Sequence, residues 1–77
     1  MVTVTLVLPG FGGCDVRFDP RLGLAGVIGE MVAAGVLPPL FDGLVWFRSL
    51  TTNRLVSALG PLSNERCVDG DVLVAVR

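Results

Sequence analysis

Reactive side chains are few in this sequence, and the two cysteines are the first candidates for chemistry. Cys14 and Cys67 are isolated rather than joined in a CxxC pair, and the chain has no histidine. Arg66 would lower the pKa of Cys67 if their side chains met, but adjacent residues of an extended segment point to opposite faces. We therefore expect free, buried, structural thiols and no zinc site.

Two further segments imitate functional motifs. Gly10-Phe11-Gly12-Gly13 lacks the Gly-Lys-Ser/Thr ending of a phosphate loop and precedes a strand rather than a helix, which favours a hairpin tip. Asp69-Gly70-Asp71 brings two carboxylates together, but before a strand this is ordinary turn chemistry. With no histidine and no second carboxylate cluster, acid–base catalysis has no candidate pair. The sequence predicts no catalytic residue, no cofactor and no enzymatic activity.

The composition indicates a small protein with more apolar residues than its interior can hold. We interpret residues 1–77 as one domain, in which 52% of residues are hydrophobic and only 17% are charged. The usual charged share of a globular domain is about 25%. Some apolar surface should therefore lie outside, where it marks interaction sites and makes self-association a reasonable expectation. The net charge of -1 gives nucleic-acid binding no electrostatic basis.

Membrane insertion and export are not expected. The longest apolar stretch, residues 22–41, is interrupted by Glu30, by four glycines and by Pro38-Pro39, whereas a spanning helix needs about 20 largely apolar residues. Met1 leads directly into a strand, without the basic region and cleavage pattern of a signal peptide. These features predict a cytoplasmic protein.

The hydrophobic periodicity predicts two strands, one helix and three further strands. Residues 2–8 and 14–18 alternate as a hairpin, and Asp19-Pro20 is typical of a helix start, with the helix running to Ala34 and Gly35 ending it. After Pro38-Pro39, strands are expected at 44–48, 55–57 (at a sheet edge) and 72–76, with a loop or helical turn at 60–65. The residues that recur at helical spacing and should face the core are Leu24, Val27, Ile28 and Met31.

This order of elements resembles ubiquitin over nearly the whole chain. More specific segments are similar to the YukD-like proteins, small bacterial ubiquitin-like proteins associated with type VII secretion systems: Asp15-Val16-Arg17-Phe18, Trp46-Phe47-Arg48, Leu62-Ser63 and Gly70-Asp71-x-Leu73. The resemblance implies an α+β fold of the ubiquitin-like β-grasp type, in which a mixed four- or five-stranded sheet packs on one helix. It also implies a bacterial protein whose partners are secretion components.

The main functional hypothesis concerns the outer face of the predicted sheet. If Leu73 and Ala75 point inward, three valines of the last strand point outward beside Trp46, which is a type of residue favoured at interfaces. A shift of one residue in register would exchange every facing. The expected partner-binding residues are Trp46, Val72, Val74, Val76 and, at the hairpin tip, Phe11.

An alternative is a protein modifier that activating and conjugating enzymes attach to targets through the carboxylate of Arg77. The last strand is followed by Arg77 without the diglycine tail of ubiquitin, which favours a protein that is not conjugated. All six basic residues are arginine, so a modifier of this sequence could not form chains on its own side chains. A third interpretation is the N-terminal domain of a larger membrane secretion component.

Overall fold

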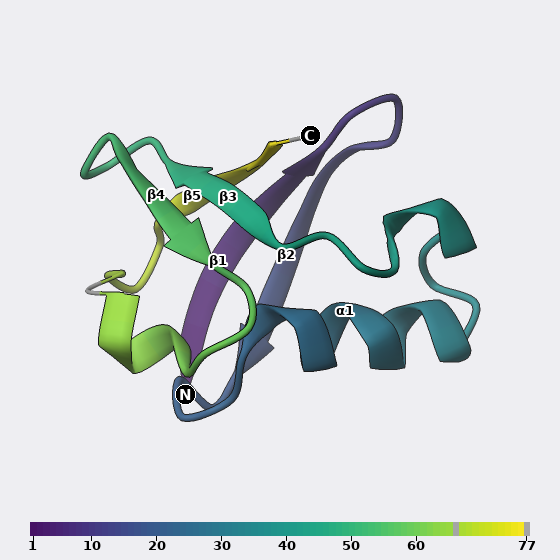
Figure 1. Cartoon of the computed structure of the whole chain (residues 1–77), viewed down its shortest axis with the longest axis horizontal. Coiled ribbons are helices and arrows are strands. Elements are labelled where there is room, and N and C mark those ends of the chain that lie inside the picture. The colour runs from purple at the N-terminus through teal and green to yellow at the C-terminus, as the bar shows by residue number, and fades with distance from the viewer. Residues whose placement is uncertain (66, 77) are drawn as a thin grey trace.

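The computed structural model describes residues 1–65 and 67–76, and Arg66 and Arg77 lie outside the described residues. The elements are β1 (Val2–Leu8), β2 (Gly12–Phe18), α1 (Leu24–Ala33), η1 (Pro39–Phe41), β3 (Trp46–Ser49), β4 (Arg54–Ser57), η2 (Leu62–Glu65) and β5 (Val72–Val76). The strands form one five-stranded sheet in the order β2-β1-β5-β3-β4 (Figure 1). β1 and β5 are parallel, whereas the other neighbours are antiparallel. The mixed sheet and the edge position of β4 confirm the sequence prediction.

The first hairpin has a tighter connection than the sequence suggested. β2 begins at Gly12, where it pairs with Leu8, two residues before the predicted start. The Phe11 amide donates to the Leu8 carbonyl at 3.0 Å, and Gly10 takes a φ of 75° that a residue with a side chain rarely adopts. The glycines were interpreted as loop residues, but their backbones extend the pairing with β1. The hairpin tip itself was predicted correctly.

The predicted start of the helix at Asp19-Pro20 was wrong. The Asp19 carboxylate accepts the Arg21 amide at 2.9 Å, and the Asp19 carbonyl accepts the Leu22 amide at 2.9 Å, so this segment is a turn. Helix α1 begins at Leu24 after the extended Gly23. A Cβ added to Gly23 would lie 2.9 Å from the Ala58 carbonyl oxygen, so the loop after β4 determines where the helix begins.

The end of the helix follows the sequence prediction. Ala34 is the C-terminal cap, and Gly35 has a φ of 77°, the left-handed geometry that ends helices. Helix α1 crosses one face of the sheet (Figure 1). Leu24 and Ile28 are buried beneath the sheet, whereas Val27 and Met31 pack half-buried at the margin of the core. Of the four helix residues predicted to face the core, two are fully buried and two are half-buried.

Pro38-Pro39 leads into a short 3-10 turn, η1, that delivers Phe41 to the core. The sheet contributes most of the remaining core through alternate residues of each strand. These inward residues are Val2, Val4, Leu6, Leu8, Val16, Phe18, Phe47, Val56, Leu73 and Ala75. The opposite face of the sheet is not covered by α1, which leaves its side chains for contacts outside the core.

Candidate interaction surface

The uncovered face of the sheet carries a continuous row of apolar side chains. Trp46 lies opposite Val76 across β3 and β5, and Val74 lies opposite Val7 across β5 and β1. Directly opposite residues point to the same face of a sheet, so these side chains are neighbours although they come from distant parts of the sequence. We call the following set the outer patch: Val7, Trp46, Leu55, Val72, Val74 and Val76.

The burial of β5 alternates as the sequence predicted. Leu73 and Ala75 are buried against the core, whereas Val72 and Val74 are half-buried and Val76 is exposed. Trp46 retains 48% of its accessible surface although its neighbour Phe47 retains none. The alternative in which Trp46 packs in the core is therefore wrong, and the outer patch presents an aromatic ring and several branched side chains to solvent.

Two members of the outer patch were not predicted from the sequence. Val7 alternates with the buried residues of β1, but the alternation does not place that strand beside β5. Leu55 is 54% exposed and lies opposite Arg48, which in turn lies opposite Val74. Only the strand order reveals these neighbours, because alternation specifies the facing of a residue and not the strand next to it.

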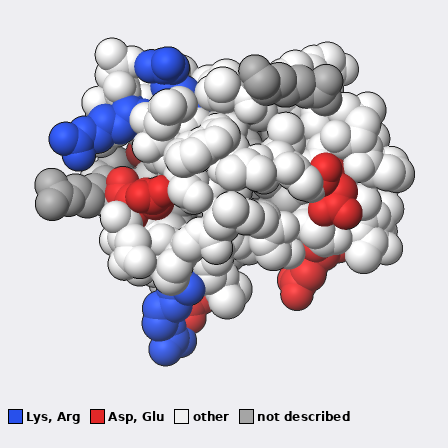
Figure 2. Space-filling model, viewed as in Figure 1, with Lys and Arg blue, Asp and Glu red and all other residues white. Residues whose placement is uncertain are grey.

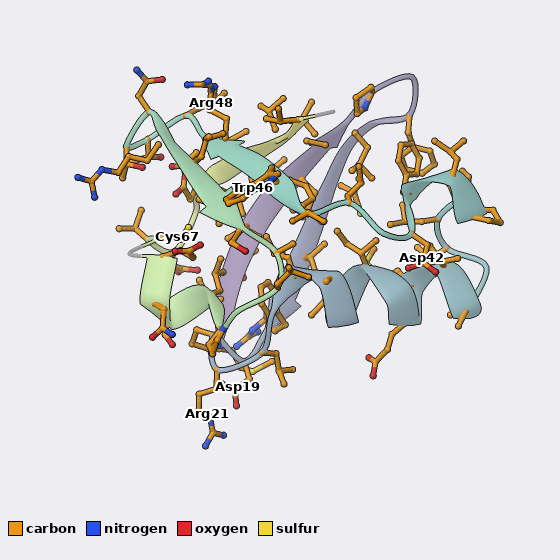
Figure 3. The ribbon with its side chains drawn as sticks, in the orientation of Figure 1. Asp19, Arg21, Asp42, Trp46, Arg48 and Cys67 are labelled. Carbon is orange, nitrogen blue, oxygen red and sulfur yellow. The ribbon has the colours of Figure 1, made fainter. Side chains whose placement is uncertain are left out.

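One charged residue, Arg48, lies within the outer face, opposite Val74 on β5 and Leu55 on β4. Figure 2, in which α1 is in view together with β3 and β4, shows the described charges separated by a broad uncharged area. In the same view Trp46 lies near the middle and Arg48 near the upper margin (Figure 3). Arg48 donates to the Asn53 Oδ1 at 3.3 Å, so this guanidinium is held toward the β3–β4 turn. Arg and aromatic residues are both enriched at protein interfaces, so a surface that combines Trp46, branched apolar side chains and Arg48 is compatible with one.

Phe11 does not join the outer patch. Its ring lies edge-on to that of Phe41, with 5.8 Å between centroids and an interplanar angle of 72°. Phe41 is the last residue of η1 and belongs to the core, so the hairpin tip is anchored there, and 46% of the Phe11 surface remains exposed. The structure therefore separates Phe11 from the other predicted partner-binding residues, which are Trp46, Val72, Val74 and Val76.

A buried carboxylate, Asp71, fixes the start of β5 against β3. The Ser49 hydroxyl donates to both Asp71 oxygens, at 2.9 Å and 2.7 Å, and the Val72 amide donates to Oδ1 at 2.8 Å. Both Asp71 and Ser49 are fully buried. Burial raises the pKa of Asp71, but hydrogen bonds from Ser49, Thr51 and the Val72 amide outweigh it and bring the pKa below its usual value.

The sequence predicts an ordinary turn role for both Asp69 and Asp71. Asp69 does act locally, because its Oδ1 accepts the Thr3 amide at 2.7 Å. Asp71 has the additional task of holding Val72 in register with β3, where the Leu50 amide donates to the Val72 carbonyl at 2.9 Å. The carboxylate is thus a structural support for the outer patch.

The environment of Cys67 disfavours a nucleophilic thiolate. Burial, with a smaller contribution from the neighbouring Asp71 and Glu65 carboxylates, raises the pKa of Cys67 to about 11. Arg66, which was considered as an activating neighbour, lies outside the described residues. Cys67 and Cys14 are free, as predicted, and each is half-buried rather than fully buried.

Other concave or polar features offer little chemistry. A shallow hollow of about 130 Å³ on α1 is lined by Leu22, Gly23, Gly26, Val27 and Glu30, with one carboxylate among apolar groups. Within residues 1–65 and 67–76, no three potential metal-ligating side chains gather. Across the same residues, no helix combines the length and apolar character that a membrane span requires.

The sequence matches no protein-family model, and a search of curated proteins also finds no match. Solved structures do resemble this chain. A de novo protein designed from ubiquitin superposes with a TM-score of 0.68 and 11% identity, covering 97% of this chain and 85% of that chain. The C-terminal ubiquitin-like domain of mouse tubulin-specific chaperone e gives a TM-score of 0.63 with 16% identity, covering 96% and 82% of the two chains.

Ubiquitin from Caldiarchaeum subterraneum superposes with a TM-score of 0.58 and 18% identity, covering 99% of this chain and 94% of that chain. At such identities the shared property is the arrangement of strands and helix. The strand order, the single described α-helix across one face and these structural neighbours together show that the chain has the ubiquitin-like β-grasp fold.

Proposed function

We propose that this chain is a non-catalytic protein-interaction module that docks the outer patch on partner proteins. The observation that carries the proposal is Trp46, which is 48% exposed beside Val76 and the half-buried Val74 on a face that α1 does not cover. Leaving apolar surface in water forgoes about 25 cal/mol for each Å² that a partner could bury. Trp is also among the residues that most often dominate interface energies.

The supporting geometry makes docking compatible with a folded, stable chain. The core is closed by the inward residues, of which Phe47 and Leu73 are fully buried. The outer patch is therefore not required to fill the interior. Its rigid sheet backbone also limits the conformational entropy that binding would cost.

The decisive experiment compares Trp46→Ala with Leu40→Ala. Leu40 is 59% exposed on η1, and so it is a matched control for the loss of an exposed apolar side chain elsewhere. A partner is first identified by site-specific photocrosslinking from position 74, and its affinity is then measured by calorimetry. We expect Trp46→Ala to weaken binding by about thirtyfold or more and Leu40→Ala to change it less than about twofold.

The reverse pattern, in which Leu40→Ala abolishes binding and Trp46→Ala does not, would place the interface beside η1 and would overturn the proposal. Thermal midpoints of both variants serve as the folding control. We expect them to remain close to that of the unmodified protein because both side chains are largely exposed.

The resemblance of Trp46-Phe47-Arg48 and the closing segment to YukD-like proteins supports bacterial secretion components of the type VII kind as the partner class. The two free cysteines are consistent with a reducing, cytoplasmic setting for such a partnership. Photocrosslinking in a host that encodes such a system tests this assignment. Recovery only of proteins unrelated to secretion would contradict it without affecting the role of Trp46.

A second candidate function is covalent protein modification, which the complete absence of lysine favours. A modifier without lysine cannot form chains on itself through side-chain amines. A denaturing immunoblot of the host, with and without deletion of Arg77, separates the two functions. High-mass bands that survive boiling in reductant and disappear on deletion would establish conjugation, whereas one band near 8 kDa would favour reversible docking.

A further inference from the structure

The sheet has two edges, and β2 forms the longer one. Thr5 of the neighbouring β1 donates its amide to the Asp71 carbonyl at 2.9 Å, and the Thr3 carbonyl accepts the Gly70 amide at 2.7 Å. The backbone groups of these threonines therefore face the β5 side. Since facing alternates along a strand, the backbone groups of Val4 and the other even-numbered residues of β1 face β2.

The same alternation identifies the free groups of β2. Val4 pairs with Val16, and Thr5 is opposite Asp15 while Thr3 is opposite Arg17. The backbone N–H and C=O groups of Val16 are thus directed to β1. Those of Asp15 and Arg17 point away from the sheet, and both residues are exposed. Within the described residues no further element pairs with this edge.

The other edge is protected. The amide of Ser57 on β4 donates to the Glu65 Oε1 at 2.6 Å, and η2, which contains Glu65, lies against this strand. β4 is also only four residues long, whereas β2 has seven. An unprotected edge strand is a template for pairing with another strand, and in this molecule that template is β2.

The charged residues of β2 indicate which strand can pair with its free edge, and in which register. Asp15 and Arg17 lie on the same face, two residues apart around Val16. If a second β2 adds in antiparallel orientation with Val16 opposite itself, Asp15 of each copy lies opposite Arg17 of the other. Shifting this register by two residues in either direction instead places Asp15 opposite Asp15 or Arg17 opposite Arg17. Opposite charges stabilise a cross-strand pair and like charges destabilise it.

We propose that two copies of this chain associate through their β2 edges in this register. Asp15 and Arg17 of the partner copy then exchange both of their backbone hydrogen bonds and form a charge pair, and the twofold axis repeats the same contact. The occupant is a second copy because the charge order of β2 complements itself when the strand is reversed. On the inner side, Cys14 lies opposite Phe18 of the partner copy.

Pairing through a single strand buries less than the roughly 1,200 Å² of a stable interface, so the association is weak and depends on concentration. The product is a continuous sheet in which both outer patches lie on one face. The two β3 strands are separated by seven strand spacings, or roughly 34 Å. A partner with two matching sites would therefore bind a dimer more tightly than a monomer.

Charge reversal tests the register. Sedimentation equilibrium from about 20 µM to about 1 mM compares the unmodified chain with Asp15→Arg, Arg17→Asp and the double variant D15R/R17D. We expect each single variant to weaken dimerisation about tenfold, because both charge pairs become repulsive. The double variant restores opposite charges across the axis and should recover the dimer. Because it contains both substitutions, that recovery also shows that neither substitution prevents folding. A mixture of the two single variants should form a heterodimer.

Amide hydrogen exchange tests the edge itself. The amides of Asp15 and Arg17 should exchange at least about tenfold more slowly at high protein concentration, while that of Val16, already bonded to β1, should not change. A chain that remains monomeric at about 1 mM would overturn the proposal. So would a dimer that resists both single reversals. Trp46→Ala should leave the dimer intact, so failure here is distinguishable from failure of the docking proposal.

Discussion

The two faces of the sheet carry similar residues in different environments. On the inner face Val4, Phe47 and Leu73 are completely buried beneath α1 and η1. On the outer face Val74 is half-buried and Trp46 is half-exposed, although both alternate along the same strands. Apolar character alone therefore does not identify the core. Coverage by the helix makes one face a structural interior and leaves the other free to bind.

Two adjacent residues of β3 should show the largest difference in stability between the two faces of the sheet. Phe47→Ala removes a fully buried ring and should destabilise the protein by about 3–5 kcal/mol, most of the stability of a small domain. Trp46→Ala removes the larger side chain but should cost less than about 1 kcal/mol, because that ring is half in water. Urea denaturation measures both. Equal losses would show that the outer face is also part of the core.

A smaller loss of stability is expected when the buried contact between Asp71 and Ser49 is changed. Asp71→Asn replaces one acceptor oxygen of a buried carboxylate by a donor facing Ser49 and the Val72 amide, and should cost about 1–3 kcal/mol. Asp69→Asn is the matched control, since the Asp69 carboxylate is exposed. Denaturation of both variants gives the comparison. An effect at Asp69 that exceeds the effect at Asp71 would contradict a structural role for the buried group.

The pH dependence of stability should also report on the Asp71 carboxylate. Because the folded pKa of Asp71 lies below its unfolded value of about 3.9, its contribution is fully present above that value. The contribution is lost as the pH falls through the folded pKa. The thermal midpoint of the unmodified protein should therefore decrease on acidification below about pH 4, and Ser49→Ala should make this decrease shallower. Identical pH profiles would show that the Ser49 hydrogen bonds do not lower the pKa.

The smallest change in stability should come from Val74→Thr. Threonine has nearly the shape of valine and favours strands, so the free energy of unfolding should change by no more than about 0.5 kcal/mol. The added hydroxyl makes the centre of the outer patch polar, and partner binding should weaken severalfold. Calorimetry of unfolding and binding measures the two effects. A large loss of stability would indicate that Val74 is more deeply covered than the half-buried position observed here.

Local sequence signals predicted most of the helices and strands, but not all of the residues at which they begin and end. The alternation of Val72 to Val76 and the glycine after the helix specified β5 and the end of α1. The start of α1 was wrong because Asp19-Pro20 has the chemistry of both a helix start and a turn. The carbonyl groups near Ala58, which lie far along the chain, pack against Gly23 and decide between them. No local pattern contains that contact.

The outer patch was likewise only partly predictable from the sequence. Trp46 and the outward valines could be predicted from alternation, whereas Val7 and Leu55 joined them only through the strand order. Phe11 was grouped with the outer patch because hairpin tips are exposed, but its ring contacts Phe41. The Ser49 contact of Asp71 depends on the antiparallel register of β3 and β5 and had no signal in the turn sequence.

Local sequence patterns specify the succession of strands and helix along the chain, the alternation within each strand and the self-complementary charges of β2. Periodicity and turn chemistry act over a few residues, so they can be recognised without the fold. The face that α1 covers, the strand edge that remains open and the serine that donates to Asp71 are all set by long-range packing. Those properties arise from contacts between residues distant in sequence, and their energies depend on register and burial that no local segment contains.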